Sequence, residues 1–163
     1  MFIGYFDSSC VVELNNGNKI HLSELNVGDC IKGINKNFCH NYKNKMECIA
    51  DTKNYYFNKI TDISSIDNKT AFEITTDEQS KIICSLGTKF KTMQRSFGLN
   101  KYNTFAIAQI LDDYECDYTD YHNFVMIYGF DFMYGFKGIG KKSLIGISVE
   151  ENNPIFINEF LVG

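Results

Sequence analysis

Residues 5–29 read YFDSSCVVELNNGNKIHLSELNVGD, a series of short apolar stretches separated by turn-forming residues. Asn16-Gly17 predicts a tight turn between two strands, because both residues tolerate a positive φ. Val27-Gly28-Asp29 predicts a second turn at the end of the stretch. Strand-length apolar runs between such turns favour a fold built from β-strands.

The same alternation continues along the chain, and sustained helical periodicity is scarce. Runs rich in Val, Ile, Phe and Thr between turn residues are AFEIT (71–75), KIICS (81–85), LIGISV (144–149) and IFINEFLV (155–162). They predict an all-β domain with at most one or two short helices. The best helix candidate is the stretch 103–111 (NTFAIAQIL), whose apolar residues share one face, and a strand is the alternative there.

The whole chain, residues 1–163, is expected to form a single domain with two decorating segments. Residues 36–59 are rich in Asn and Lys and predict a polar excursion or a hairpin. Residues 112–122 (DDYECDYTDYH) are acidic with regularly placed tyrosines and predict a solvated loop.

Composition excludes several classes of function. The chain of 163 residues is 44% hydrophobic and 22% charged, which indicates a globular protein with a proper core. A formal charge of -4, with scattered rather than striped Lys and Arg, disfavours a nucleic-acid binder. The first residues lack the basic start of a signal peptide, and no run of about 18 apolar residues could span a bilayer. A cytoplasmic or other intracellular setting is expected. The abundance of Asn, Lys, Ile and Tyr is typical of an AT-rich genome, as in some protists, bacteria or large DNA viruses.

The six cysteines form no Cys-x-x-Cys pair, and a domain of this size does not need disulfides to fold. We expect them to be reduced and structural. The nearest approach to a metal cluster is Cys30, Cys39-His40 and Cys48, whose spacing matches no common zinc framework. No metal site and no cofactor are therefore expected.

Three blocks of the sequence carry a resemblance to a known family. They run from Gly4 to Asp29, from Ile74 to Phe90, and from Leu144 to Gly163. In order, they are similar to a Gly-Cys-Phe start followed by a strand and a Val-Gly-Asp ending, an extended run before Thr-x-x-His, and a terminal Asn-Gly-containing hairpin. These are the blocks of the Hint superfamily, which comprises inteins, bacterial intein-like domains and the hedgehog autoprocessing domain. The resemblance implies a horseshoe of short antiparallel strands with pseudo-twofold symmetry. The alternative is an unrelated β domain in which the same motifs are ordinary turns.

The residues that would carry the family's chemistry are replaced. In the family, a first-block Cys or Ser attacks the preceding carbonyl, and the second-block His protonates the departing nitrogen. The matching positions hold Tyr5, Ser85 and Thr88, while Gly146 and Gly163 replace the helper Asp and the penultimate His of the third block. A phenol oxygen cannot bend back onto its own upstream carbonyl, and a threonine cannot act as an acid near neutrality. The resemblance thus implies catalytic degeneracy, and no catalytic residue is expected.

Cys10 is the fallback nucleophile. Its thiol could attack the Ser9 carbonyl, but Cys10 lies five residues beyond the family position. The competing interpretation is a small buried apolar residue within a strand. His21, His40 and His122 all fall outside the family's catalytic positions.

We therefore expect an inactive Hint homologue that serves as a structural or protein-interaction module. Its partner would be another protein or a parent polypeptide, with no nucleic acid and no membrane involved. The aromatic, glycine-rich stretch 126–140 (MIYGFDFMYGFKGIG) could act as a contact surface or in self-association, and two core strands are the other interpretation. An active self-processing domain that uses Cys10 is the alternative function. A small-ligand β-barrel is a third, and it would have a deep interior pocket.

Overall fold

A computed structural model describes residues 2–35, 55–96, 99–106 and 122–163. The chain opens with three short strands, β1 (Gly4–Phe6), β2 (Val11–Glu13) and β3 (Lys19–His21), followed by the 3-10 turn η1 (Leu22–Glu24) and β4 (Cys30–Ile34). The middle holds β5 (Tyr55–Thr76), β6 (Lys81–Cys84), β7 (Lys89–Ser96) and β8 (Leu99–Ala106). The last part holds β9 (His122–Met126), β10 (Gly129–Val149), the 3-10 turn η4 (Glu150–Asn152), β11 (Ile155–Ile157) and β12 (Phe160–Val162).

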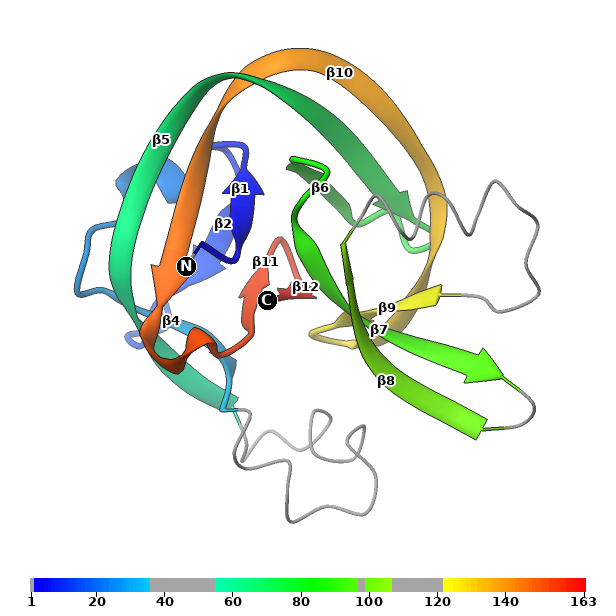
Figure 1. Cartoon of the computed structure of the whole chain (residues 1–163). Coiled ribbons are helices and arrows are strands. Elements are labelled where there is room, and N and C mark those ends of the chain that lie inside the picture. Colours follow the sequence, from blue (N-terminus) through cyan, green and yellow to red (C-terminus); the bar gives the residue numbers. More distant parts are fainter. Residues whose placement is uncertain (1, 36–54, 97–98, 107–121) are drawn as a thin grey trace.

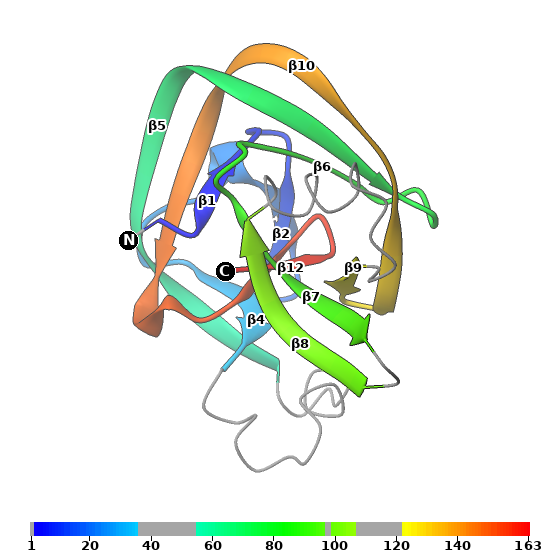
Figure 2. The ribbon, with the colours of Figure 1, turned by 45° about the vertical axis from the view of Figure 1, so that its right-hand side comes forward.

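The two long strands β5 and β10 form an antiparallel ribbon that arches over the rest of the molecule (Figure 1). They pair from Met133↔Thr76 to Val149↔Ile60, with four register shifts that let the ribbon bend. The strand order of the main sheet is β10-β1-β6-β5-β4-β11-β12-β9-β7-β8, and β2 and β3 form a separate hairpin. Turned by 45°, the same arch is seen to enclose β1, β6 and the terminal hairpin β11–β12 (Figure 2).

The described residues confirm the predicted all-β antiparallel fold, but not the shortness of every strand. β5 has 22 residues and β10 has 21, because each continues through bulges where the sequence shows turn-like polar or glycine residues. The predicted turn at Asn16-Gly17 is present between β2 and β3, and Gly17 has a φ of +86°.

The helix predicted at 103–111 is wrong for residues 103–106, the part that the structure describes. Residues 103–106 belong to β8, which pairs with β7 from Lys89↔Ala106 to Ser96↔Leu99. The β7–β8 pairing provides hydrogen-bond partners for the backbone groups of both strands. This gain outweighs the weak helical preference that the spacing of apolar residues indicates. Residues 107–111 lie outside the described part.

The decorating segments are described only in part. Residues 55–59 of the segment 36–59 form the start of β5, where they pair with β4 from Cys30↔Lys59 to Ile34↔Tyr55. Residues 36–54 lie outside the described part, as do residues 112–121 of the second segment. His122 begins β9.

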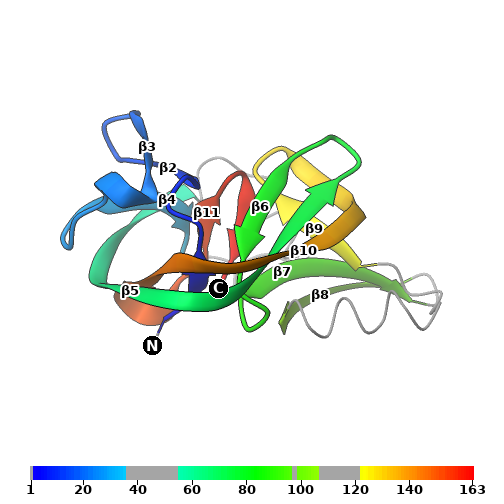
Figure 3. The same cartoon turned by 90° about the horizontal axis from the view of Figure 1, so that it is seen from above.

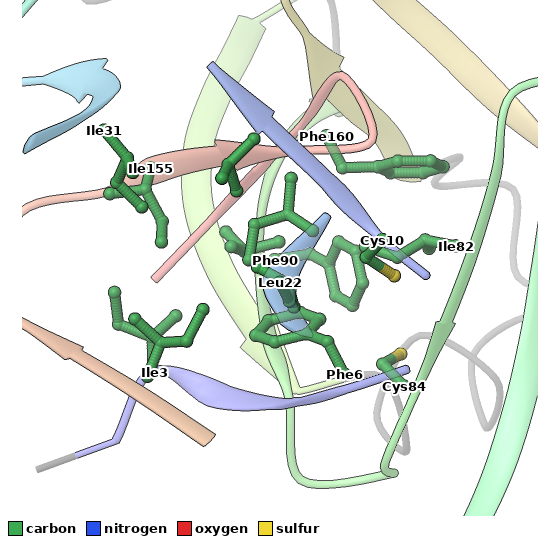
Figure 4. Close-up of a cluster of buried hydrophobic side chains, with 14 of the residues drawn as sticks. Ile3, Phe6, Cys10, Leu22, Ile31, Ile82, Cys84, Phe90, Ile155 and Phe160 are labelled. Atoms are coloured by element: carbon green, nitrogen blue, oxygen red, sulfur yellow. The ribbon is translucent and has the colours of Figure 1, made fainter. Parts of the chain in front are cut away.

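The core lies beneath the arch, between the ribbon and the terminal hairpin. Phe90, Phe124 and Phe160 pack edge to face, with ring centroids 5.3 to 5.8 Å apart. Phe6 of β1 and Leu22 of η1 belong to the same cluster, as Figure 4 shows. Among the described residues, no helix is long and apolar enough to cross a membrane.

Candidate functional site

β1 is inserted between β10 and β6, and two glycines make this possible. Tyr5 is the strand partner of Gly146, and a Cβ at Gly146 would lie 2.6 Å from Cε1 of the Tyr5 ring. A Cβ at Gly4 would lie 2.7 Å from Oγ1 of Thr88. Only glycine fits at either position without displacing the neighbouring side chain. Gly4 and Gly146 therefore allow β1 to lie this close to β10 and to Thr88.

The turn after β6 holds the backbone of Tyr5. The Ser85 amide donates to the Tyr5 carbonyl at 3.0 Å, and the Tyr5 amide donates to the Thr88 hydroxyl at 3.4 Å. The hydroxyls of Ser85 and Thr88 lie 3.2 Å apart and are buried. Two of the positions that match the family's second block therefore contact the first-block position directly.

Gly163 completes the group of matching positions. Its amide donates to the carbonyl of Lys89, the residue after Thr88, at 2.9 Å. A Cβ at Gly163 would lie 3.4 Å from Cγ2 of Ile3. The end of β12 thus lies beside the start of β1. All five positions singled out from the sequence gather around β1.

The chemistry available at this site is limited. The Tyr5 ring packs over Gly146 and lies 5.7 Å from the Phe2 ring, centroid to centroid. Ser85 and Thr88 carry hydroxyls, which do not titrate near neutrality. The thiol of Cys84, the residue before Ser85, is fully buried, and its pKa is raised by burial and by the neighbouring Cys10. The contacts of Ser85 and Thr88 hold the backbone of β1 in place.

Cys10 belongs to the core rather than to an open site. Its side chain is 1% exposed, and its thiol lies 3.8 Å from the Ile83 carbonyl. Figure 4 shows the sulfurs of Cys10 and Cys84 pointing toward one another among apolar side chains. Burial raises the pKa of Cys10 to about 11. The described cysteines Cys10, Cys30 and Cys84 are all free.

The turn before Cys10 carries a polar cluster that the sequence did not reveal. The Asp7 carboxylate accepts from the Ser9 amide at 3.1 Å and from the Ser9 hydroxyl, and it pairs with Lys142 at 2.7 Å. Burial alone would raise the pKa of Asp7, but the hydrogen bonds from Lys142 and Ser9 outweigh it, so the pKa lies below its ordinary value. An Asp two residues before a Ser is a local sequence signal for the Asp7–Ser9 turn. Nothing in the sequence indicates that Lys142 contacts this turn.

His21 lies at the same turn. Its Nδ1 is 2.9 Å from the Ser9 carbonyl oxygen, on the exposed side of β3. This carbonyl belongs to the Ser9–Cys10 peptide bond. For His122 the backbone alone is described, and His40, Cys39 and Cys48 lie outside the described residues. Among the described residues, no three His, Cys, Asp or Glu side chains gather as a metal site would require.

A groove of about 410 Å³ opens between the β2–β3 hairpin and the turns that follow β5 and β11. It is lined by the buried residues Val12 and Phe156 and by exposed charged residues, among them Lys19, Lys81 and Glu78. The groove lies between turns at one end of the molecule, whereas a small-ligand barrel would hold its pocket inside the barrel.

Comparison with known proteins agrees with this geometry. No family model matches the sequence, and no curated protein matches it. The structure is similar to the gp41-1 intein, with 15% identity, a TM-score of 0.63, and 98% of this chain and 97% of that one covered. It is also similar to a DnaB intein from Synechocystis, with 13% identity, a TM-score of 0.61, and 98% and 96% covered. A bacterial intein-like domain from Clostridium thermocellum matches with 10% identity, a TM-score of 0.64, and 98% and 97% covered. This chain therefore has the Hint fold of inteins and intein-like domains, as its three sequence blocks predicted.

Proposed function

We propose that this chain is a catalytically degenerate Hint domain that acts as a structural or protein-interaction module. The observation that carries the proposal is the packing of Tyr5. Where an active relative would present a nucleophile, a tyrosine ring packs over Gly146 and Phe2, with its backbone held by Ser85 and Thr88. A phenol at this position cannot reach its own upstream carbonyl, so the covalent route is lost.

The proton donor is lost with the nucleophile. Thr88 lies where the family's second block has its histidine, and its hydroxyl is committed to Tyr5 and Ser85. Loss of a general acid alone lowers a rate by roughly 10²–10⁴-fold. The two replacements together support a role in which the fold is kept for its surface and its stability. The free thiols of Cys10, Cys30 and Cys84 fit a reducing, intracellular setting, which we include in the proposal.

The experiment uses the full chain placed between two folded reporter domains. The fusion is incubated at pH 8 with and without dithiothreitol or hydroxylamine, and its intact mass is followed for several days. We expect the fusion to remain whole, while circular dichroism confirms a folded β domain. Fragments cut beside Tyr5 or after Gly163 would contradict the proposal.

One observation favours a second candidate, self-cleavage at Ser9–Cys10. His21 lies within hydrogen-bond distance of the Ser9 carbonyl that Cys10 would attack. The inward position of the Cys10 thiol and its raised pKa weigh against this reaction, because a protonated, buried thiol is a poor nucleophile. Fragments that end at Ser9 and disappear in Cys10→Ala and His21→Ala would establish it, and a Ser8→Ala variant is the matched control.

A further inference from the structure

The start of β10 carries an exposed aromatic patch made of Phe132 and Tyr134, which stand two residues apart. These side chains are 49% and 72% exposed. The other large hydrophobic side chains exposed in the described residues are Val27 and Leu86, in separate turns, and Tyr128, whose hydroxyl is bonded to the buried Asp131 carboxylate at 2.8 Å. Grouped exposed aromatics are typical of interaction surfaces, whereas single exposed apolar residues are ordinary.

The backbone explains why Tyr134 projects. Met133 pairs with Thr76 and Gly135 pairs with Thr75, so Tyr134 is left without a partner on β5. A bulge of this kind turns a side chain away from the sheet. Met133 and Phe136, on either side of it, pack against the core and anchor the strand. A Cβ at Gly135 would meet nothing within 4 Å, so the surface beside Tyr134 is open.

The two ends of the patch carry opposite charges. At one end, the Asp77 amide donates to the Phe132 carbonyl at 3.1 Å and the Glu78 amide donates to the Asp131 carboxylate at 3.1 Å. The β5–β6 turn with these exposed acidic residues therefore lies against the β9–β10 hairpin, as Figure 3 shows. At the other end is Lys137, whose ammonium lies 3.6 Å from Glu73 and whose side chain is 69% exposed.

We propose that this patch binds the same patch of a second copy of the chain, in an antiparallel, twofold arrangement centred near Tyr134. Asp77 lies beside Phe132, two residues before Tyr134, and Lys137 lies three residues after it. At a rise of about 3.3 Å per residue, the two charged ends are roughly 7 and 10 Å from the centre. A twofold rotation therefore places Lys137 of each copy against the acidic turn of the other.

A second copy fits this surface better than other partners. A twofold contact needs a self-complementary surface, and an uncharged aromatic centre between an acidic and a basic end meets that condition. Asp131 is the one carboxylate within the hairpin, and it is buried and bonded to the Tyr128 hydroxyl at 2.8 Å, so it does not oppose the contact. A nucleic acid would meet the acidic turn, and a purely basic peptide would meet Lys137.

The test is the oligomeric state of the whole chain, measured by sedimentation equilibrium from about 1 μM to 1 mM, the range expected for a small interface. We expect reversible dimerisation, and we expect Tyr134→Ser to raise the dissociation constant at least about tenfold. Val27→Ser removes an exposed apolar side chain elsewhere and should leave the constant unchanged. A chain that stays monomeric throughout, or a dimer equally stable in Tyr134→Ser, would overturn the proposal.

Charge reversal tests the antiparallel arrangement itself. Lys137→Glu should weaken the dimer, because each copy would then set a glutamate against the acidic turn of the other. Lys137→Glu combined with Glu78→Lys in the same chain should restore it, whereas Lys59→Glu, at the far end of β5, should have no effect. If the double variant stays as weak as the single one, this arrangement is wrong. The result does not depend on whether the chain cleaves itself, so each proposal can fail alone.

Discussion

The Tyr5 ring occupies the space that a side chain at position 146 would need. Cε1 and Cδ1 of this ring would lie 2.6 and 3.0 Å from a Cβ built on Gly146, and Phe2 closes the remaining side at 3.3 Å. The two residues are strand partners in β1 and β10. Tyr5 and Gly146, which the sequence comparison predicts to stand at the family's nucleophile and helper positions, therefore fit one another, which links two predicted replacements that the sequence presents as separate.

This fit makes Gly146→Ala destabilising. The added methyl group forces the Tyr5 ring out of place, and overpacking of this kind costs about 1–3 kcal/mol. Gly135→Ala, on the same strand with open space around it, should change the free energy of unfolding by less than about 0.5 kcal/mol. Urea unfolding measures both variants. In a Tyr5→Ser background the ring is gone, so Gly146→Ala should then lower the free energy of unfolding by much less. If the effects of the two substitutions simply add, Tyr5 and Gly146 do not compete for the same space.

The ion pair between Asp7 and Lys142 makes stability depend on pH. The pKa of Asp7 is lowered in the fold, so its contribution is present above the ordinary carboxyl pKa and is lost as the pH falls through the lower folded value. Asp7→Asn should reduce the free energy of unfolding by about 1 kcal/mol at pH 7. The difference from the wild type should shrink below about pH 4, where the wild-type carboxyl becomes protonated. Urea unfolding of both proteins from pH 2.5 to 7 measures this difference in the free energy of unfolding. A difference that is constant across the range would contradict the lowered pKa of Asp7.

Asn158 ties the terminal hairpin to the N-terminal strands. Its φ is +47°, its Oδ1 accepts from the Val11 amide at 2.6 Å, and its Nδ2 donates to the Lys81 carbonyl at 2.9 Å. Asn158→Ala loses both side-chain bonds and strains the turn, so we expect a loss of about 2–3 kcal/mol. Asn158→Gly relieves the strain and should lower the free energy of unfolding by less than Asn158→Ala does. Hydrogen exchange at the Val11 amide should accelerate in both variants, and an unchanged rate would mean that this bond does not hold β2.

The buried thiols should resist modification. At pH 8 a thiol with a pKa of about 11 is roughly one part in a thousand thiolate, and Cys10 is also closed to solvent. Brief treatment with iodoacetamide followed by peptide mass mapping should therefore label Cys30, which is half-buried, well before Cys10 or Cys84. In urea the three should react alike. Rapid labelling of Cys10 in the folded chain would revive the case for its role as a nucleophile.

The local sequence was enough to identify the fold class. Asn16-Gly17 and the break between the runs 71–75 and 81–85 are signals that act over a few residues, and the structure has a turn at each place. The resemblance of the three blocks added the type of fold, that of inteins and intein-like domains. Because backbone turns and alternating apolar residues are dictated locally, they can be read without knowing what the chain packs against.

Tertiary pairing decided the rest. Residues 103–106 became a strand because β7 offered them a complete ladder, and β5 and β10 grew long because each is the other's partner through the bulges. The approach of Lys142 to Asp7, the inward turn of the Cys10 thiol and the projection of Tyr134 depend on contacts between segments far apart in sequence. No residue type carries such information alone, since the energy of each contact depends on burial and distance that only the folded chain sets.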